Sequence, residues 1–359
     1  MDIKVREEYL LRAIKLHKEN PVADAHLDLA GEILLRKEAG EKNIIRNHYL
    51  EHWKSAGMNL IMSSVYIPTQ LIAKQGIEAA WKNALSQIEV LRKECGEIED
   101  AEIITCKTEL ENVLEQGKIG ILMYMEGLDC IGTNLERLFI LHEKGVRGAA
   151  LTWSRKNALA VGCCKAGEYR QIPGGLSSVG KQVIEKMEQL SWFLDVSHLN
   201  DDGFAEVAEL ATRPFLATHS CARNVYDNYR NLTDKQMKVL AEKGGVMGLN
   251  GCMLIAGSGS GNHLEMLCRH GEYEAEKIGA EHVCFGFDLC DSYDRAEYEL
   301  QRRKDEAAKP PKPADCFLHH GQIPLLTAAL LQRGMEEEKV ISIMGQNLIN
   351  YLKQILPEQ

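Results

Sequence analysis

The sequence lacks the features that mark several large classes of protein. Its 359 residues contain 42 Lys and Arg against 52 Asp and Glu, which gives a formal net charge of −10, and no basic block is present. Such a chain offers little attraction to nucleic acid or to an anionic membrane. No apolar run reaches membrane-spanning length, and the first 20 residues are charged throughout, with no apolar signal core. We therefore expect neither nucleic acid nor membrane as a partner.

Cysteine is plentiful, at 11 residues, but no CxxC pair is present. Neither a zinc ribbon nor a thioredoxin-like redox site is therefore indicated. Several cysteines stand inside apolar runs, such as Cys284 in "HVCFGFDL", where a reduced thiol acts as a small hydrophobic side chain. We expect reduced thiols and a cytoplasmic location.

Eight short β-rich runs alternate with long stretches of helical periodicity. The runs cover residues 21–29, 59–67, 118–126, 145–153, 192–199, 214–220, 244–250 and 282–289. Most are nearly continuous apolar runs, which is typical of parallel strands that are buried on both faces. One of the intervening helices, "TDKQMKVLAEKG", begins with an N-cap residue, Thr233, and ends at Gly244. The pattern predicts an α/β fold, a (β/α)₈ TIM barrel, and no linker divides residues 1–359 into more than one domain.

One stretch after the eighth strand differs from the rest in composition. Residues 295–315, "RAEYELQRRKDEAAKPPKPAD", are charged and rich in proline. In a barrel this insertion lies over the mouth that the carboxyl ends of the strands form. Two interpretations stay open here, a disordered insertion and a lid or substrate-facing loop.

Polar residues gather where the predicted strands end. The first strand carries Asp24, His26 and Asp28 at every second position, so all three side chains leave on one face. Other strands end at Glu126, His198, His219 and Asp288. A lone histidine at a strand end is usually a structural residue. Three histidines and three carboxylates in one mouth, however, would be costly to bury without a partner for the charge, and a divalent metal is the natural partner.

The types of ligand narrow the choice of metal. Imidazoles mixed with carboxylates, without cysteine, suit zinc or a related transition ion better than calcium. The ligands suffice for two ions if one carboxylate bridges them, and such a site holds and activates a water or hydroxide between the ions. His26 and Asp28 are two residues apart and can reach the same ion. Asp24 lies one pleat deeper, so we expect it to support the site rather than to bind metal.

An ordered set of motifs resembles the renal (membrane) dipeptidase family of zinc peptidases, peptidase family M19 of the amidohydrolase-like superfamily. The motifs extend from about residue 22 to residue 350. They read "DAHLDL", "MEGLD", "VRGAALTW", "DVSH", "THSCARNVYDNYRNLTD", "GGVMGLN", "GFD" and "IMGQNLI". Each piece is weakly specific, but the ordered set is highly specific.

The resemblance implies a zinc-dependent dipeptidase that uses a metal-bridging water or hydroxide, and it assigns residue roles. His26 and Asp28 would bind one zinc, and His198 and His219 the other. Glu126 would bridge both ions. Asp288 would relay a proton to the leaving amine, and Arg230 would hold the terminal carboxylate of the substrate. Without the resemblance, Arg230 would be read as a surface arginine.

The sequence departs from the family pattern in the substrate pocket. Trp153 stands where the family has a histidine that helps to bind the scissile carbonyl. Cys290 replaces the second carboxylate of an Asp-x-Asp-Gly motif, and "IMSS" replaces a Gln-Phe-Trp-Ser stretch before Tyr66. We expect Trp153 and Tyr66 to contact the substrate. Because the metal ligands are intact and the substrate pocket is altered, the sequence supports a hydrolase activity more strongly than a specificity for dipeptides.

Several alternatives remain. The same chemistry could act on an N-acyl amino acid or a modified peptide. A mononuclear deaminase usually opens with His-x-His, and a phosphotriesterase-like enzyme bridges its metals with a modified lysine after strand four; here Glu126 on strand three takes that place. A metal-binding scaffold without activity would be expected to have lost ligands, whereas all are present. A small peptide is the expected partner, and the resemblance suggests a homodimer.

Overall fold

The computed structural model describes residues 4–163, 165–166, 170–258, 263–304 and 309–359. All eight predicted strands are present. They are β1 (Val22–Leu27), β2 (Met58–Tyr66), β4 (Ile119–Glu126), β5 (Val146–Ala150), β8 (Phe193–Asp195), β9 (Ala217–Ser220), β10 (Met247–Leu249) and β11 (Val283–Phe285). Their pairings are parallel.

The strands form two hydrogen-bonded groups that together curl into a ring. One group has the order β1-β2-β4-β5-β8, and the other has the order β11-β10-β9. A parallel bridge between Asp195 and Leu216 joins β8 to the start of β9. On the other side β1 contacts β11, and the Asp24 carboxylate accepts the backbone N–H of Phe287 at 2.9 Å. This arrangement confirms the predicted α/β barrel.

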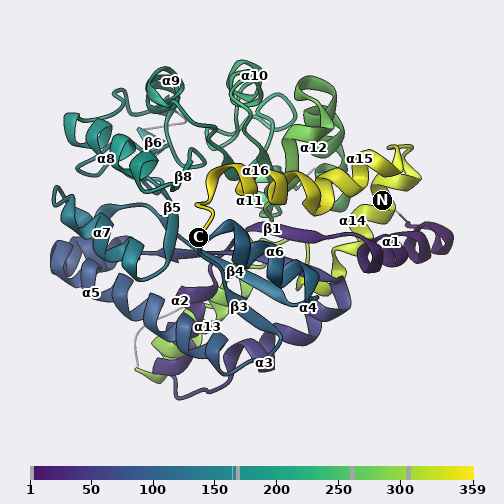
Figure 1. Cartoon of the computed structure of the whole chain (residues 1–359), viewed down its shortest axis with the longest axis horizontal. Helices are drawn as coiled ribbons and strands as arrows, with labels where there is room; N and C mark the ends of the chain where they lie inside the picture. Colours follow the sequence, from purple (N-terminus) through teal and green to yellow (C-terminus); the bar gives the residue numbers. More distant parts are fainter. Residues whose placement is uncertain (1–3, 164, 167–169, 259–262, 305–308) are drawn as a thin grey trace.

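Helices surround the strands (Figure 1). They are α1 (Glu7–Glu19), α2 (Leu29–Glu38), α3 (Ile44–His48), α4 (Leu50–Ala56), α5 (Thr69–Gly96), α6 (Lys107–Glu115), α7 (Glu136–Glu143), α8 (Ser178–Gln189), α9 (Asp201–Leu210), α10 (Asp234–Glu242), α11 (Met253–Ala256), α12 (His263–Ile278), α13 (Asp291–Arg303), α14 (Pro324–Gln332), α15 (Glu337–Ile341) and α16 (Asn347–Ile355). Short turns of helix η1 (Asp129–Ile131), η2 (Ala280–His282), η3 (His320–Gln322) and η4 (Ser342–Gln346) lie between them. The Thr233 cap of α10 is confirmed as a capping box with Gln236.

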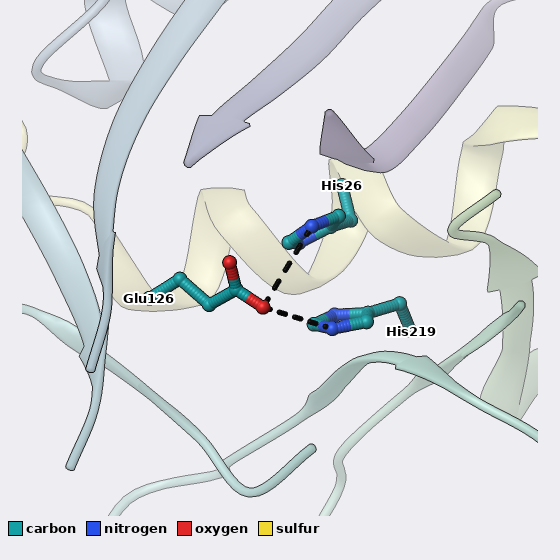
Figure 2. A group of neighbouring side chains, drawn as sticks. All are labelled: His26, Glu126 and His219. Carbon is teal, nitrogen blue, oxygen red and sulfur yellow. Dashed lines mark ion pairs between the residues drawn. The ribbon is translucent and has the colours of Figure 1, made fainter. Parts of the chain in front are cut away.

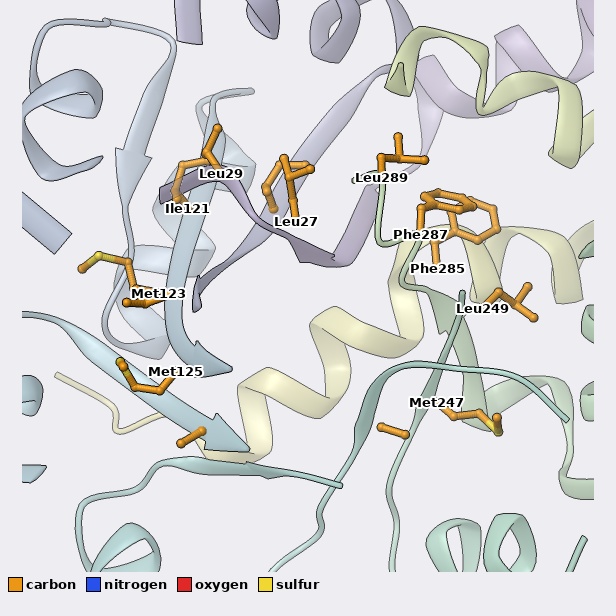
Figure 3. Close-up of a cluster of buried hydrophobic side chains, with 14 of the residues drawn as sticks. Leu27, Leu29, Ile121, Met123, Met125, Met247, Leu249, Phe285, Phe287 and Leu289 are labelled. Carbon is orange, nitrogen blue, oxygen red and sulfur yellow. The ribbon is translucent and has the colours of Figure 1, made fainter. Parts of the chain in front are cut away.

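The two faces of β4 show how the barrel positions its site. One face packs among helical side chains through Ile121, Met123 and Met125 (Figure 3). The alternate residues Leu122 and Tyr124 pack with side chains of neighbouring strands in a second buried cluster, and that face points into the ring. Glu126 continues this inner face at the last residue of the strand. The period of two therefore carries its carboxylate to the mouth of the barrel.

Some elements differ from the prediction. Strand β3 (Ala101–Ile103) pairs with the start of β4, and β6 (Lys165–Ala166) pairs with β7 (Arg170–Gln171) as an antiparallel hairpin. The runs were too short to be recognised in the sequence. The predicted strand over 192–199 ends at Asp195, because the Asp195 carboxylate accepts the Ser197 N–H and turns the chain before His198. The predicted strand therefore extended too far at its carboxyl end.

The insertion after β11 is partly helical. Residues 295–303 belong to α13, which packs on α2, whereas residues 305–308 lie outside the described part of the chain. A wholly disordered insertion is therefore wrong. Within the described part of this segment, Glu297 lines the cavity at the mouth of the barrel, next to Tyr293 and Asp294 from the start of α13. Among the described residues, no helix is both long and apolar enough to cross a membrane.

Candidate metal centre and substrate cavity

A cavity of about 710 Å³ opens at the carboxyl ends of the strands. Its lining includes seven of the predicted site residues: Asp28, Tyr66, Glu126, Trp153, His198, Arg230 and Asp288. His26 and His219 are 0 % and 1 % exposed. They lie behind the lining, and the Nε2 atom of each faces the carboxylate of Glu126. A hollow of about 540 Å³ at the opposite ends of the strands, beside Pro21 and Ile119, is lined by none of these nine residues.

Glu126 is the point on which the imidazoles converge. Its Oε1 lies 2.8 Å from Nε2 of His198, 3.4 Å from Nε2 of His219 and 4.0 Å from Nε2 of His26. Figure 2 shows Glu126 entering from one side and the rings of His26 and His219 from the other. The His26 and His219 ring centroids are 3.7 Å apart, and the Nε2 atoms of His198 and His219 are 2.9 Å apart. Three nitrogen atoms thus face one carboxylate.

Hydroxyl groups hold the opposite ring nitrogens. Nδ1 of His198 lies 2.9 Å from the Ser154 hydroxyl, and Nδ1 of His219 lies 2.6 Å from the Thr218 hydroxyl. Nδ1 of His26 contacts the Tyr124 hydroxyl. These contacts fix the rings so that each Nε2 points inward, as outer contacts do in metal sites.

Two further carboxylates surround His26. Its Nε2 lies 3.4 Å from Oδ1 of Asp288 and 3.8 Å from Oδ1 of Asp28, yet this fully buried nitrogen has no hydrogen-bond partner among the described residues. Asp28 accepts the Ser64 hydroxyl. Asp288 has a left-handed backbone, with φ of 54°, and accepts the Asn250 side-chain N–H at 3.0 Å. A short-side-chain acid tolerates this conformation better than most residues.

Burial shapes the electrostatics of the carboxylates. It raises the pKa of Asp28 to about 6, against the effect of the Ser64 hydrogen bond. It also raises the pKa of Glu126 and of Asp288 well above their ordinary values, and the neighbouring Asp28 adds to both shifts. Negative charge is therefore costly at this place unless a cation balances it.

The pKa values of the three imidazoles shift in the opposite direction, downward. Burial lowers the pKa of His26 to about 3, and the nearby Arg230 guanidinium contributes. Burial likewise lowers the pKa of His198 and His219 well below the ordinary value. All three rings are neutral near pH 7, which is the form that binds metal.

Arg230 is 3 % exposed, so the interpretation as a surface arginine is wrong. Its guanidinium donates to the Ser220 hydroxyl and to the His219 carbonyl, each at 2.9 Å, and reaches Nε2 of His198 at 3.2 Å. The positive charge thus lies in the cavity wall beside the imidazoles.

Comparison with known proteins decides the family. The profile of the membrane dipeptidase family, peptidase family M19, matches residues 10–306. This chain belongs to peptidase family M19. Dipeptidase 3 of Mus musculus is 27 % identical over 370 residues, covering 99 % of this chain and 67 % of that protein.

Solved structures agree with this assignment. A metallopeptidase from Rhodobacter sphaeroides, solved with a phosphinate mimic of the dipeptide L-Ala-D-Ala, is 26 % identical with a TM-score of 0.77, covering 94 % of this chain and 99 % of that one. A family M19 metallopeptidase described as dipeptidase AC is 24 % identical with a TM-score of 0.79 and shows the shared fold, again over 94 % and 99 %. The predicted family is thereby confirmed, and with it the enzyme class, a hydrolase of the metallo-dipeptidase family.

Two of the residues that depart from the M19 pattern, Trp153 and Cys290, line the cavity, whereas the "IMSS" stretch does not. The Trp153 ring stands between Tyr66 and His198, with ring centroids 5.4 and 5.8 Å away. The Arg155 guanidinium lies 5.4 Å from the Trp153 ring and pairs with Asp129 at 3.0 Å, which fixes this wall. Trp153 therefore forms part of the cavity wall beside the imidazole of His198.

Cys290 and Asp24 have supporting positions. Cys290 lines the cavity, and its thiol donates to Asp315 at 3.4 Å. The Asp24 carboxylate accepts from His320 at 2.9 Å and from the His26 backbone N–H at 3.2 Å, in addition to Phe287. It therefore ties β1 to β11 beneath the site, consistent with the supporting role expected from the sequence.

A metal fits the site of this M19 chain. The donor set of neutral imidazoles and buried carboxylates is one that binds zinc. The unpartnered Nε2 of His26, within 4 Å of Asp28, Glu126 and Asp288, is an atom that a cation would satisfy. His26, Glu126 and His219 form one group of closely spaced ligand atoms, and His26, Asp28 and Asp288 form another.

Sequence reasoning missed the partners of the imidazoles. Tyr124 precedes Glu126 by two residues and so shares its strand face, a signal that the alternation contained. Thr218 is adjacent to His219, and its hydroxyl also donates to Asp195 at 2.6 Å. Ser154 had no such signal, because only the folded chain brings it to His198.

Proposed function

We propose that this chain is a dipeptidase that hydrolyses the amide bond of small dipeptides with the aid of two zinc or related divalent ions. The observation that carries the proposal is the convergence of three imidazole Nε2 atoms on Glu126 beside a cavity of about 710 Å³, which is large enough to admit a dipeptide. The M19 relative bound to a dipeptide mimic supports the same substrate class.

The ligands divide into two groups around one carboxylate. His26 and Asp28 would hold one ion, His198 and His219 would hold the other, and Glu126 lies between the two groups. Two divalent ions bound there would polarise the scissile carbonyl and lower the pKa of an attacking water.

The remaining chemistry belongs to side chains of the cavity. Asp288 would take the proton of the attacking water at a carboxylate oxygen and deliver it to the leaving amine. The Asn250 amide orients this carboxylate from behind, at 3.0 Å. Arg230 would bind the terminal carboxylate of the substrate, because a buried guanidinium fork matches a carboxylate in shape and charge.

The charge of the cavity favours dipeptides over N-acyl amino acids. Asp294 and Glu297, on one face of α13, line the cavity in addition to Asp28, Glu126 and Asp288. A free amino group is a cation at neutral pH and is attracted by this wall, whereas an acylated nitrogen is neutral. Arg230 would serve both substrate classes equally, so the amino end makes the distinction.

The experiment is a matched substrate screen. Metal-free protein is loaded with Zn²⁺, its metal content is measured, and release of free amino acids is followed from a panel of dipeptides and from the N-acetylated form of each. We expect hydrolysis of the free dipeptides, loss of activity in chelator and recovery on reloading. Preference for the acetylated series would support the alternative amidohydrolase, and inactivity toward both series with two ions bound would contradict the proposal.

A further inference from the structure

A second group of ligand-type side chains lies behind the cavity wall, next to the end of the strand that carries His219. Cys221 follows the end of β9, and His270 and Glu274 lie one turn apart on α12. All three are completely buried, at 0 % exposure. A thiol sulfur, an imidazole nitrogen and a carboxylate oxygen of this group lie within 4.8 Å of one another.

The tautomer of His270 is set by its surroundings. Its Nε2 lies 2.9 Å from the carbonyl oxygen of Ala256, which can only accept, so Nε2 carries the proton. Nδ1 therefore carries a lone pair, which accepts the Ala222 N–H at 3.3 Å, and Oε1 of Glu274 lies 4.0 Å from the same nitrogen. A histidine that binds metal through one ring nitrogen usually donates the N–H of its other ring nitrogen to a backbone carbonyl or a carboxylate.

The carboxyl group of Glu274 is unusual because it is buried without hydrogen-bond partners in the described part of the chain. Both of its carboxylate oxygens are buried and have no hydrogen-bond partner among the described residues. Burial raises its pKa well above the ordinary value, offset only in part by the nearby Ala222 N–H. A buried carboxyl without partners costs folding free energy, whether it is ionised or merely loses its hydrogen bonds to water.

We propose that Cys221, His270 and Glu274 bind a structural zinc ion, or a similar thiophilic divalent cation, at a site separate from the cavity. Thiolate, imidazole and carboxylate are the three ligand types that zinc takes in proteins. One thiolate and one carboxylate balance the two positive charges, so the buried group becomes neutral overall. Binding releases the thiol proton, and any proton on the carboxyl, to solvent.

The position of this site links it to the cavity wall. The Cys221 backbone N–H bonds the Asn231 side chain at 3.1 Å, and the Cys221 carbonyl accepts the Leu232 N–H at 2.9 Å. The ion would therefore join α12 both to the strand that carries His219 and to the loop that carries Arg230. Its role is to hold the wall in place, and it does not depend on the proposed reaction.

Cobalt substitution tests the proposal through its spectrum. The residues proposed as ligands in the cavity contain no cysteine, so a thiolate-to-cobalt charge-transfer band in the near ultraviolet reports a sulfur ligand elsewhere. We expect three equivalents of Co²⁺ and this band in the wild-type chain. Cys221→Ser should lose the band and about one equivalent. Cys290→Ser, which alters the separate group of Cys252, Cys290 and Asp315, should retain both.

Glu274→Gln gives a second test, in which the expected change in Tm differs between zinc and chelator. This test can be used even if Cys221→Ser fails to fold. Without a bound ion, removing an unpartnered buried carboxyl leaves Tm unchanged or raises it. With an ion, the same change weakens binding, so Tm falls in zinc while it is unchanged or higher in chelator. Two equivalents of cobalt without a thiolate band, or a Glu274→Gln chain that is as stable as wild type in zinc, would overturn the proposal.

Discussion

The carboxylate of Glu126 lies 2.8 Å from Nε2 of His198, at the point where β4 ends and the imidazoles from β1 and β9 arrive. Glu126→Gln keeps the shape of the side chain and removes its charge. Because one neutral amide cannot balance two cations, we expect loss of the second metal and of nearly all activity. Metal analysis together with dipeptide hydrolysis measures both, and full activity with two ions bound would refute the bridging role.

Asp288, whose Oδ1 lies 3.4 Å from Nε2 of His26, is the residue proposed to carry the proton. Asp288→Asn should fold normally, because asparagine also tolerates the left-handed backbone at φ of 54°. We expect metal content to stay at the wild-type level while kcat falls ~10²–10⁴-fold, the usual contribution of a general acid–base group. If metal is lost together with activity, Asp288 is a ligand instead.

Arg230 should act on substrate binding. Lysine keeps the charge in Arg230→Lys but cannot form the paired N–H bonds that a guanidinium gives to a carboxylate, so we expect kcat/KM to fall roughly 10- to 100-fold, mainly through KM. Arg223→Lys is the matched control, because Arg223 pairs with Asp201 at 2.8 Å outside the cavity lining. Equal effects of the two changes would show that Arg230 has only a structural role.

The barrel and the residues at its mouth could be predicted because both follow from short-range patterns. Apolar runs identify strands, and parallel strands place their last residues at one mouth, so Glu126 and His198 meet although the chain between them is long. The exact strand ends could not be predicted, since they depend on side-chain hydrogen bonds such as that from the Ser197 N–H to the Asp195 carboxylate.

The residues that contact the proposed metal ligands could not be predicted from the sequence, for a different reason. Ser154 reaches His198, and Cys221 reaches His270 and Glu274, only after the strands and helices pack. The buried state of Arg230 likewise comes from tertiary structure, because a single arginine in a polar loop has no periodic signal.

Trp153 should narrow the range of substrates. Its ring stands between Tyr66 and His198, where the family has a smaller histidine. Trp153→His should broaden the accepted dipeptides and raise kcat/KM for ordinary ones, and Trp153→Phe, which keeps the bulk without the indole N–H, should cost little. A fall of more than roughly tenfold in Trp153→Phe, about 1.4 kcal/mol, would show that the indole N–H binds the substrate.

His17 should make folding stability depend on pH at a place remote from the cavity. It is buried between α4 and α14, with Nδ1 donating to Ala56 at 2.7 Å and Nε2 accepting from Thr327 at 2.8 Å. Burial lowers its pKa from 6.5 to about 4, so the unfolded chain binds a proton more readily. Its contribution is therefore complete above pH 6.5 and is lost as pH falls toward 4, to an extent on the order of 2 to 3 kcal/mol.

The His17→Gln variant isolates this effect, because buried His26 and His270 have lowered pKa values too and shift the wild-type curve in the same direction. Glutamine does not titrate, so the wild-type chain should exceed the variant in free energy of unfolding at pH 7.5 and lose most of that advantage by pH 4.5. Urea unfolding of both chains in chelator measures the difference without pH-dependent metal binding. A difference that stays constant across this range would mean that His17 is not held neutral by the fold.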